Sequence, residues 1–225
     1  MVVKTKRIST TAGNGASIRP QEHVFIPKPE FGVFSCIIRG TTPYVQHRFS
    51  EKARKAILDS QKKIAKQAKP DRDPEADYLA ACYVFPGHDA GAKDCKYGIP
   101  VTQLKGALVG ACRYVDGISM KMASGVVQFL PEEGGLIELH FDTMTMREDG
   151  VRIDNGRKFD LRYRPEFGGW WAKVRIQYNT ALMSSEQIVN LLATAGFHCG
   201  LGEMRPNSKM GVGGSNGLFS VENAK

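Results

Sequence analysis

The chain lacks the cysteine patterns that define disulfide-rich domains and zinc modules. Its five cysteines are an odd number, and no two of them form a C-x-x-C pair. A disulfide framework needs paired cysteines, and a standard zinc site needs closely spaced ligands on both sides of the metal. We therefore expect reduced, mostly buried thiols at Cys36, Cys82, Cys95, Cys112 and Cys199.

Long apolar runs and nucleotide-binding signatures are missing as well. No run reaches the roughly 18 apolar residues that a membrane span needs, and the N-terminal M-V-V-K-T-K-R has no apolar signal-peptide core. No P-loop, dinucleotide-binding fingerprint or paired-carboxylate metal motif is present. We expect a cytoplasmic protein without a metal, a cofactor or a membrane partner.

Positive charge is in excess. Lysine and arginine total 31 against 23 acidic residues in a chain of 225, which gives a formal net charge of +8. Such an excess favours a polyanionic partner, although charge alone does not distinguish nucleic acid from an acidic membrane surface. The length and the 42% hydrophobic content suit one domain with insertions over 31–225, preceded by a flexible or extended arm over 1–30. The stretches 50–96 and 147–170 carry no motif of their own and are the expected insertions.

Hydrophobic periodicity predicts the order of the elements. We expect a strand from Phe31, a basic helix capped by Ser50, a short helix after Pro74 and a central helix near Thr102. Strands at 126–130 and 137–146 suggest a hairpin, 172–178 alternates clearly, and a helix capped by Ser184 or Ser185 ends at Gly196. The alternation predicts an α+β fold of ferredoxin or RNA-recognition type, with an antiparallel sheet and helices on one face.

The C-terminal tail is rich in glycine. Seven glycines lie between Gly196 and Gly217, together with Arg205 and Lys209. Such a loop is costly to order unless it packs closely against something, and successive backbone N–H groups form anion-binding nests. We expect this loop to hold a phosphate backbone, with an ordinary surface connection as the alternative.

Basic and aromatic residues cluster in several other places. The segment 52–69 carries seven lysines and arginines, and aromatic residues alternate with charge around 44–49 and 162–171. Single-strand binders combine positive grooves with aromatic platforms for bases. Of the two adjacent tryptophans we expect one in the core and one exposed. The predicted nucleic-acid-binding residues are Arg39, Tyr44, His47, Arg48, Arg54, Lys55, Lys62, Lys63, Lys105, Arg113, Arg162, Arg164, Trp170, Arg205 and Lys209.

The histidines are scattered, and no nucleophile or acid–base pair is evident in the sequence. His47 beside Arg48 and His198 beside the tail are the two candidates for a general base. Without an assembled pair we expect contact or structural roles and no catalytic activity.

Two separated segments resemble the RAMP superfamily of CRISPR-associated proteins. I-P-V-T-Q-L-K-G-A-L at 99–108 resembles the segment that opens the first core helix in many Cas7-like members, and 200–219 resembles their glycine-rich loop. The turn G-T-T-P-Y at 40–44 resembles the family's first strand and turn. Thr102 and Gln103 replace the usual paired serines, and Val109 stands near the usual arginine position. The segments R-Y-R-P-E-F-G-G-W-W and G-L-G-E-M-R-P-N-S-K are similar to bacteriophage proteins of the same superfamily.

The resemblance implies a modified RNA-recognition fold and a nucleic-acid-binding role. We expect a non-enzymatic protein that binds single-stranded nucleic acid, with DNA favoured, in phage replication or recombination, and that forms a homo-oligomer or filament along the strand. Two alternatives are a Cas7-like guide-RNA-binding subunit, or a phage mimic of one, and a metal-independent endoribonuclease of Cas6 type that uses His47 or His198.

Overall fold

The computed structural model describes residues 26–64, 71–153, 157–206 and 214–223. Its central unit is an antiparallel sheet in the order β4-β8-β1-β9. The strands are β1 (Phe31–Gly40), β4 (Val127–Leu130), β8 (Trp171–Asn179) and β9 (Phe219–Asn223). The helix α3 (Val101–Ala111) lies between β1 and β4 in sequence, and α5 (Ser185–His198) lies between β8 and β9. Each helix thus joins two strands that are separated in the sheet by another strand, which is the ferredoxin-like arrangement, and the predicted α+β fold is confirmed.

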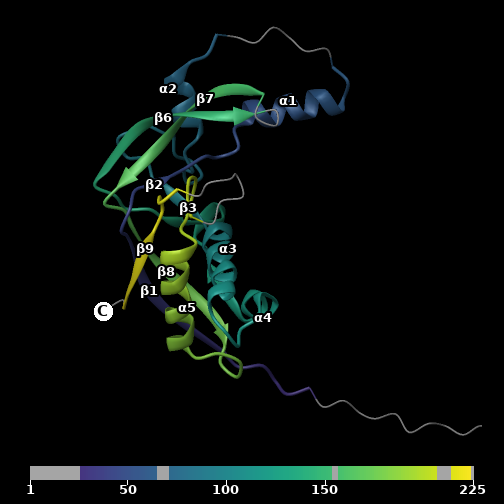
Figure 1. Cartoon of the computed structure of the whole chain (residues 1–225), viewed down its shortest axis with the longest axis vertical. Coiled ribbons are helices and arrows are strands. Elements are labelled where there is room, and N and C mark those ends of the chain that lie inside the picture. Colours follow the sequence, from purple (N-terminus) through teal and green to yellow (C-terminus); the bar gives the residue numbers. More distant parts are fainter. Residues whose placement is uncertain (1–25, 65–70, 154–156, 207–213, 224–225) are drawn as a thin grey trace, which may run out of the picture.

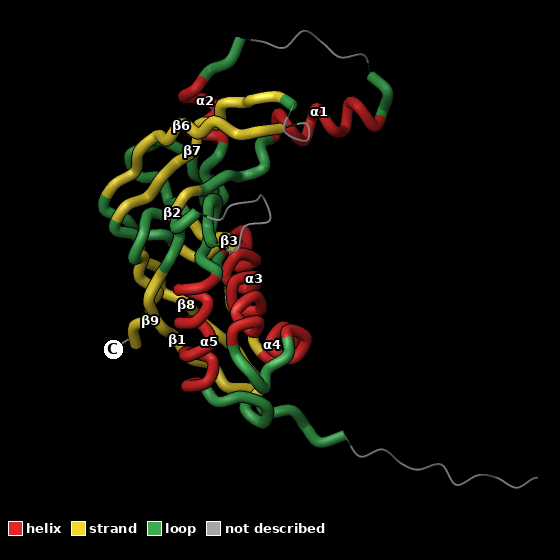
Figure 2. Tube along the Cα trace, viewed as in Figure 1, coloured by secondary structure: helices red, strands yellow, loops and turns green. Residues whose placement is uncertain are grey.

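Alternation along the strands separates two faces of this sheet. Ile38 of β1 and Val174 and Ile176 of β8 are fully buried, whereas Lys173 and Arg175 between them are exposed. The buried side packs against α3 and α5, which lie together in front of the sheet in Figure 2. Burial of each such side chain contributes about 1.5–3 kcal/mol, so this layer holds the fold together. The other face, here called the open sheet face, is free of helices among the described residues.

Several of the remaining elements form a second region at the other end of the molecule (Figure 1). They include α1 (Glu51–Gln61), α2 (Pro74–Ala80) and a long antiparallel hairpin of β6 (Thr143–Ile153) and β7 (Lys158–Gly168), to which β2 (Tyr44–Val45) adds a third strand. Arg72 connects α2 to the hairpin, because its guanidinium lies 2.9 Å from Asp77 and 2.8 Å from Asp160. Further short elements are β3 (Gly98–Pro100), η1 (Cys112–Tyr114), α4 (Met120–Val126), η2 (Glu133–Gly135) and β5 (Leu136–Glu138).

Strand pairing differs from the sequence-based prediction in one place. The strands predicted at 126–130 and 137–146 do not form a hairpin with each other. Val127–Leu130 pairs with β8, Leu136–Glu138 pairs with β3, and Thr143–Ile153 pairs with β7. Each of these strands pairs with a strand that is distant in the sequence. Pairing with β8 is favourable for β4 because it buries Val127 and Phe129 against the helices.

Helix boundaries follow the predicted caps with two exceptions. Ser50 caps α1, and Ser184 caps α5 in a capping box with Gln187. The central helix, however, begins at Val101 after Pro100 without a side-chain cap, so Thr102 lies inside it. Helix α5 continues through Gly196 to His198; a Cβ at Gly196 would lie 2.0 Å from the Phe219 carbonyl oxygen. This glycine therefore permits the close approach of α5 to β9 rather than ending the helix.

Only the end of the predicted N-terminal arm is described, and the expected absence of a membrane span can be compared with the described helices. Residues 1–25 of the predicted arm lie outside the described residues, and 26–30 are exposed and without regular structure. Within the described ranges, none of the helices has the length and apolar character needed to cross a bilayer.

Candidate nucleic-acid interface

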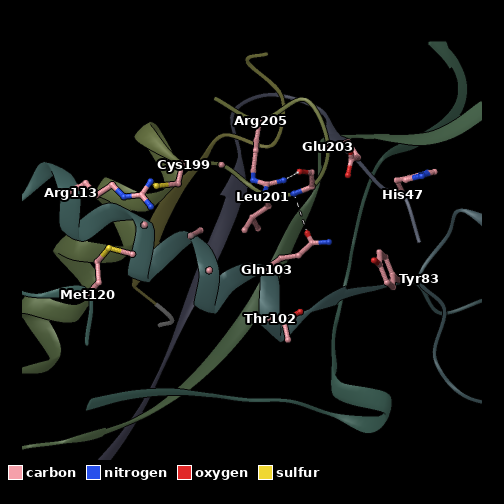
Figure 3. Close-up of a pocket in the computed structure, with 15 residues that line it drawn as sticks. His47, Tyr83, Thr102, Gln103, Arg113, Met120, Cys199, Leu201, Glu203 and Arg205 are labelled. Atoms are coloured by element: carbon pink, nitrogen blue, oxygen red, sulfur yellow. Dashed lines mark hydrogen bonds between the residues drawn. The ribbon is translucent and has the colours of Figure 1, made fainter. Parts of the chain in front are cut away.

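A cleft of about 460 Å³ lies between α3 and the chain that follows α5. We call it the α3 cleft. One wall is the outward side of α3, from Thr102 to Gly110, and the other is the segment 199–205. His47 and Tyr83 lie at one end and Arg113 at the other (Figure 3). The cleft brings together residues from four separate parts of the sequence, and its volume falls in the range of about 300–1,000 Å³ that is usual for small-molecule sites.

Backbone packing, not an anion nest, explains the glycines that are described here. The N–H groups of 199–203 all donate hydrogen bonds within the protein: those of Cys199 and Gly200 to the Ala195 carbonyl, that of Leu201 to Gly217, that of Gly202 to the Gln103 side chain and that of Glu203 to Val45. None of these five is left for a phosphate, so the nest expected here is not formed by this part of the loop.

Gly202 shows why the segment needs glycine. Its φ is +73°, and a Cβ would lie 2.3 Å from the Val45 carbonyl oxygen and 2.6 Å from the ring of Tyr44. The turn therefore lies directly against β2, and it is joined there by the hydrogen bond from Glu203 N to Val45 O at 2.9 Å. Glycine is the residue that accepts both the left-handed backbone and the close contact. The result is a rigid wall for the cleft.

Two arginines give the α3 cleft its positive charge. Arg205 extends from the glycine-rich segment toward α3 and donates to the Gly202 carbonyl (Figure 3). Arg113 follows α3 and lies with its guanidinium beside Cys199 at the far end. Guanidinium groups are suited to phosphate because they present several donors in a planar fork. Both residues were predicted from the sequence, and the structure places both in one cleft.

The opposite end of the α3 cleft is polar and has different chemistry. His47, Tyr83, Gln103 and Glu203 surround it (Figure 3). Gln103 accepts two hydrogen bonds at Oε1, from Tyr44 Oη at 2.9 Å and from Gly202 N at 3.1 Å. Burial raises the pKa of Tyr83, and the nearby Glu203 carboxylate raises it further, so the phenol stays neutral at physiological pH.

His47 is held in its neutral form at this end. Burial lowers its pKa first of all, and the positive charges of Arg164 and Arg162 lower it further, against an opposing effect of Glu203. Arg162 NH1 lies 3.5 Å from His47 Nε2, so a neutral ring that accepts there carries its proton on Nδ1. Nδ1 is buried and has no hydrogen-bond partner among the described residues. The imidazole is thus a neutral base with one unsatisfied polar atom.

Three of the predicted contact residues lie in the core instead. Tyr44 is 0% exposed, Trp170 1% and Arg164 3%. The Trp170 indole donates to the Thr42 carbonyl at 2.8 Å, and Arg164 pairs with the buried Asp149 at 3.1 Å. The apolar ring area and the ion pair are better satisfied inside the protein than against a ligand. Trp171, by contrast, is half-buried and stacks on His140 at 3.9 Å between ring centroids.

Other predicted cations take part in intramolecular contacts. Lys105 Nζ donates to the carbonyls of Ser124 and Val127, where α4 ends and the edge strand β4 begins, and burial lowers its pKa. Arg39 on the open sheet face pairs with Glu222 at 3.0 Å. Arg162 lies 3.8 Å from Asp160. A lysine over a strand edge satisfies its carbonyls and protects it from pairing, so Lys105 has a structural role here.

The remaining predicted residues lie away from the α3 cleft. Arg54, Lys55, Lys62 and Lys63 are exposed on or just after α1, and Arg48 is half-buried before it. Lys209 lies outside the described residues. The open sheet face carries Arg39, whereas the α3 cleft lies on the helix side of the sheet.

Most residues that line the α3 cleft are absent from the sequence-based prediction, among them the polar side chains of Tyr83, Gln103 and Glu203. The signal for Gln103 is its polar side chain on an otherwise apolar central helix. Glu203 is an acidic residue within a basic, glycine-rich tail, where phosphate binding alone would disfavour it. Tyr83 has no distinguishing local pattern. In the described part of the chain no group of three or more His, Cys, Asp or Glu side chains is arranged to hold a metal ion.

Comparisons with known proteins identify no family. No family model matches the chain, and no curated protein sequence matches it. Among solved structures, it is similar to a chain in the cryo-EM structure of the Type III-B Cmr-beta bound to cognate target RNA, with a TM-score of 0.45 and 13% sequence identity. The match covers 87% of this chain and 60% of the other, so this chain spans about 60% of the length of that relative.

Proposed function

We propose that this protein binds single-stranded nucleic acid without catalysing a reaction on it, and that the α3 cleft is the central contact. The observation that carries the proposal is the pair of arginines, Arg113 and Arg205, in one cleft of about 460 Å³. The guanidinium groups would bind phosphate, and the exposed lysines of α1 would extend the electrostatic path. The formal charge of +8 is consistent with a polyanionic ligand.

The finer parts of the proposal rest on sequence resemblance. We favour DNA over RNA, and a role in phage replication or recombination in the host cytoplasm, because the segments 162–171 and 200–209 are similar to those of phage proteins. Assembly of several copies along one strand would make the binding cooperative.

A salt titration tests the binding. A labelled single strand of about 20 nucleotides is titrated by fluorescence polarisation at about 50 and 200 mM salt. We expect the affinity to fall by about 50-fold, which is the loss for roughly four phosphate contacts on a single strand. Arg113→Ala and Arg205→Ala should each weaken binding about tenfold, because each removes a charge-assisted phosphate contact.

Lys93→Ala is the matched control, because Lys93 is an exposed cation outside the cleft. Affinity that responds neither to salt nor to the two arginine substitutions would rule the proposal out. Incubation with labelled RNA in the presence of a chelator tests whether the protein lacks catalytic activity. Cleavage by the wild type that disappears in His47→Ala would show instead that the protein is a metal-independent nuclease.

A further inference from the structure

The α3 cleft contains a carboxylate where a purely phosphate-binding groove would not tolerate one. The Glu203 side chain is about one-third exposed, and its carboxylate lies 4.0 Å from the Arg164 NH2 group. At that distance the pair is weak, so the carboxylate oxygens keep acceptor capacity on the cleft side. Because a carboxylate repels phosphate, the sugar-phosphate backbone cannot pass close to Glu203. Another part of the nucleotide must lie there.

We therefore expect the phosphate and the base of the nucleotide to lie at different ends of the cleft. Arg113 lies at one end and Arg205 in the middle, whereas Glu203, Tyr83 and His47 lie at the other end (Figure 3). A phosphate placed by the arginines therefore directs the attached base toward Glu203. The Tyr83 ring at that end can provide an aromatic surface for the base.

Gln103 adds a donor of fixed orientation at the same end of the cleft as the carboxylate. Its Oε1 already accepts from Tyr44 Oη and Gly202 N, so the amide cannot rotate without losing both bonds. The Nε2 group consequently faces Tyr83 across the cleft end (Figure 3). The Gln103 amide also hydrogen-bonds to the Tyr83 side chain, so its second N–H group is the donor offered at the end of the cleft that holds the two acceptor oxygens of Glu203.

These groups match one base edge better than the others. The Watson–Crick edge of guanine presents an acceptor, O6, followed by two adjacent donors, N1–H and N2–H₂, whereas each of the other bases presents a single donor group there. A carboxylate can accept hydrogen bonds from both guanine donors at once, and an amide N–H can donate a hydrogen bond to O6. We propose that the Glu203 end of the α3 cleft recognises one unpaired guanine base in the bound strand, with Glu203 on N1–H and N2–H₂ and Gln103 on O6. This inference rests on the proposed function.

The test compares three single strands of equal length: oligothymidine, the same strand with isolated guanines spaced by thymines, and that strand with inosine in place of guanine. Inosine lacks only the N2 amino group. We expect wild-type protein to bind the guanine strand roughly tenfold more tightly than oligothymidine, as for one bidentate base contact, and inosine to remove most of the gain. Glu203→Gln should bind all three strands alike, because an amide offers one acceptor and one donor. Glu132→Gln, an exposed acidic residue outside the cleft, should keep the wild-type pattern.

The outcomes separate this inference from the function on which it rests. If the wild type binds all three strands equally well, guanine recognition is wrong and strand binding stands. If it binds none, the proposed function fails. A guanine preference that persists in Glu203→Gln also overturns the inference. Thermal unfolding shows whether that variant folds, and if it does not, the inosine comparison on wild-type protein decides alone.

Discussion

At the scale of single residues, the cleft depends on glycines that allow two backbone segments to pack in close contact. Gly202 brings the turn after α5 against β2, and the adjacent Glu203 N bonds to Val45. The same turn positions Glu203 and Arg205, the two residues of opposite charge in the cleft to which we assign base and phosphate contacts. Conformational freedom at Gly202 is therefore tied both to stability and to the geometry of the site.

Gly202→Ala should lower the free energy of unfolding by roughly 2 kcal/mol or more, since the new Cβ meets both an unfavourable φ and the Val45 carbonyl oxygen. Urea denaturation followed by circular dichroism measures the change. Gly106→Ala is the matched control: Gly106 also lines the cleft, but it lies within α3 and a Cβ there meets no atom within 4 Å. That variant should be stabilised by about 0.5–1 kcal/mol through helix propensity. Equal stability of the two variants would contradict this reading of Gly202.

At the scale of elements, α1 differs from every other long helix of the described structure because it buries none of its residues. Ile57 and Leu58 are 50% and 43% exposed, and lysines and arginines occupy much of the remaining surface. An isolated helix of this length is marginal in water. Its order in solution should therefore depend on a ligand that covers it, and the neighbouring cations favour a polyanion.

Replacing Lys55 and Lys62 by alanine should reduce the salt dependence of strand binding. The slope of log affinity against log salt should become less steep by up to about 1.4, at about 0.7 per lost phosphate contact on a single strand. Alanine is a strong helix former, so the helix itself is not weakened. The double variant of the exposed Lys28 and Lys93 removes the same charge elsewhere and should leave the slope unchanged. Identical slopes for the two double variants would show that α1 does not follow the strand.

At the scale of the whole molecule, the cationic surfaces of the described residues are distributed over several separate places. The α3 cleft lies on the helix side of the core, α1 lies toward the hairpin end, and Lys173 and Arg175 lie on the open sheet face. RNA-recognition sheets stack bases on aromatic residues of their central strands. Here the central positions of the open face are Ser35 and Ile37 on β1, opposite Arg175 and Lys173 on β8. These central positions of the open face hold no aromatic side chain, which is why we propose the cleft and not the sheet as the base-binding place.

Strand length should separate the contributions of the cleft and of α1. A strand of about four nucleotides is expected to bind the cleft alone, whereas one of about 20 also reaches α1 and binds more tightly. Arg113→Ala should weaken both complexes, and the Lys55 and Lys62 double variant should weaken only the longer one. Titrations of both strands at one salt concentration measure this. A short strand that responds to the α1 variant would place its binding site elsewhere.

Local patterns predicted a large part of the fold and a smaller part of the site. Ser50 and Ser184 marked the starts of α1 and α5, and alternation identified β8. Among site residues, His47, Arg113 and Arg205 do line the cleft. Tyr44, Arg164 and Trp170 have the same residue types and are buried, because aromaticity and charge in a sequence do not distinguish a ligand contact from a core contact or an internal ion pair.

The amino-acid sequence by itself determined the kinds and order of the main strands and helices of the central sheet, but not β7 or α4, since helix and strand periodicities are properties of neighbouring residues. It also determined the excess of positive charge. Only the tertiary structure decided that β4 pairs with β8 and that Lys105 covers a strand edge. It also decided that the Gln103 side chain accepts a hydrogen bond from Gly202 N, 99 positions away in the sequence. The physical reason is that pairing and burial depend on contacts between distant segments, and those contacts are selected by the packing of the whole core, which no local pattern contains.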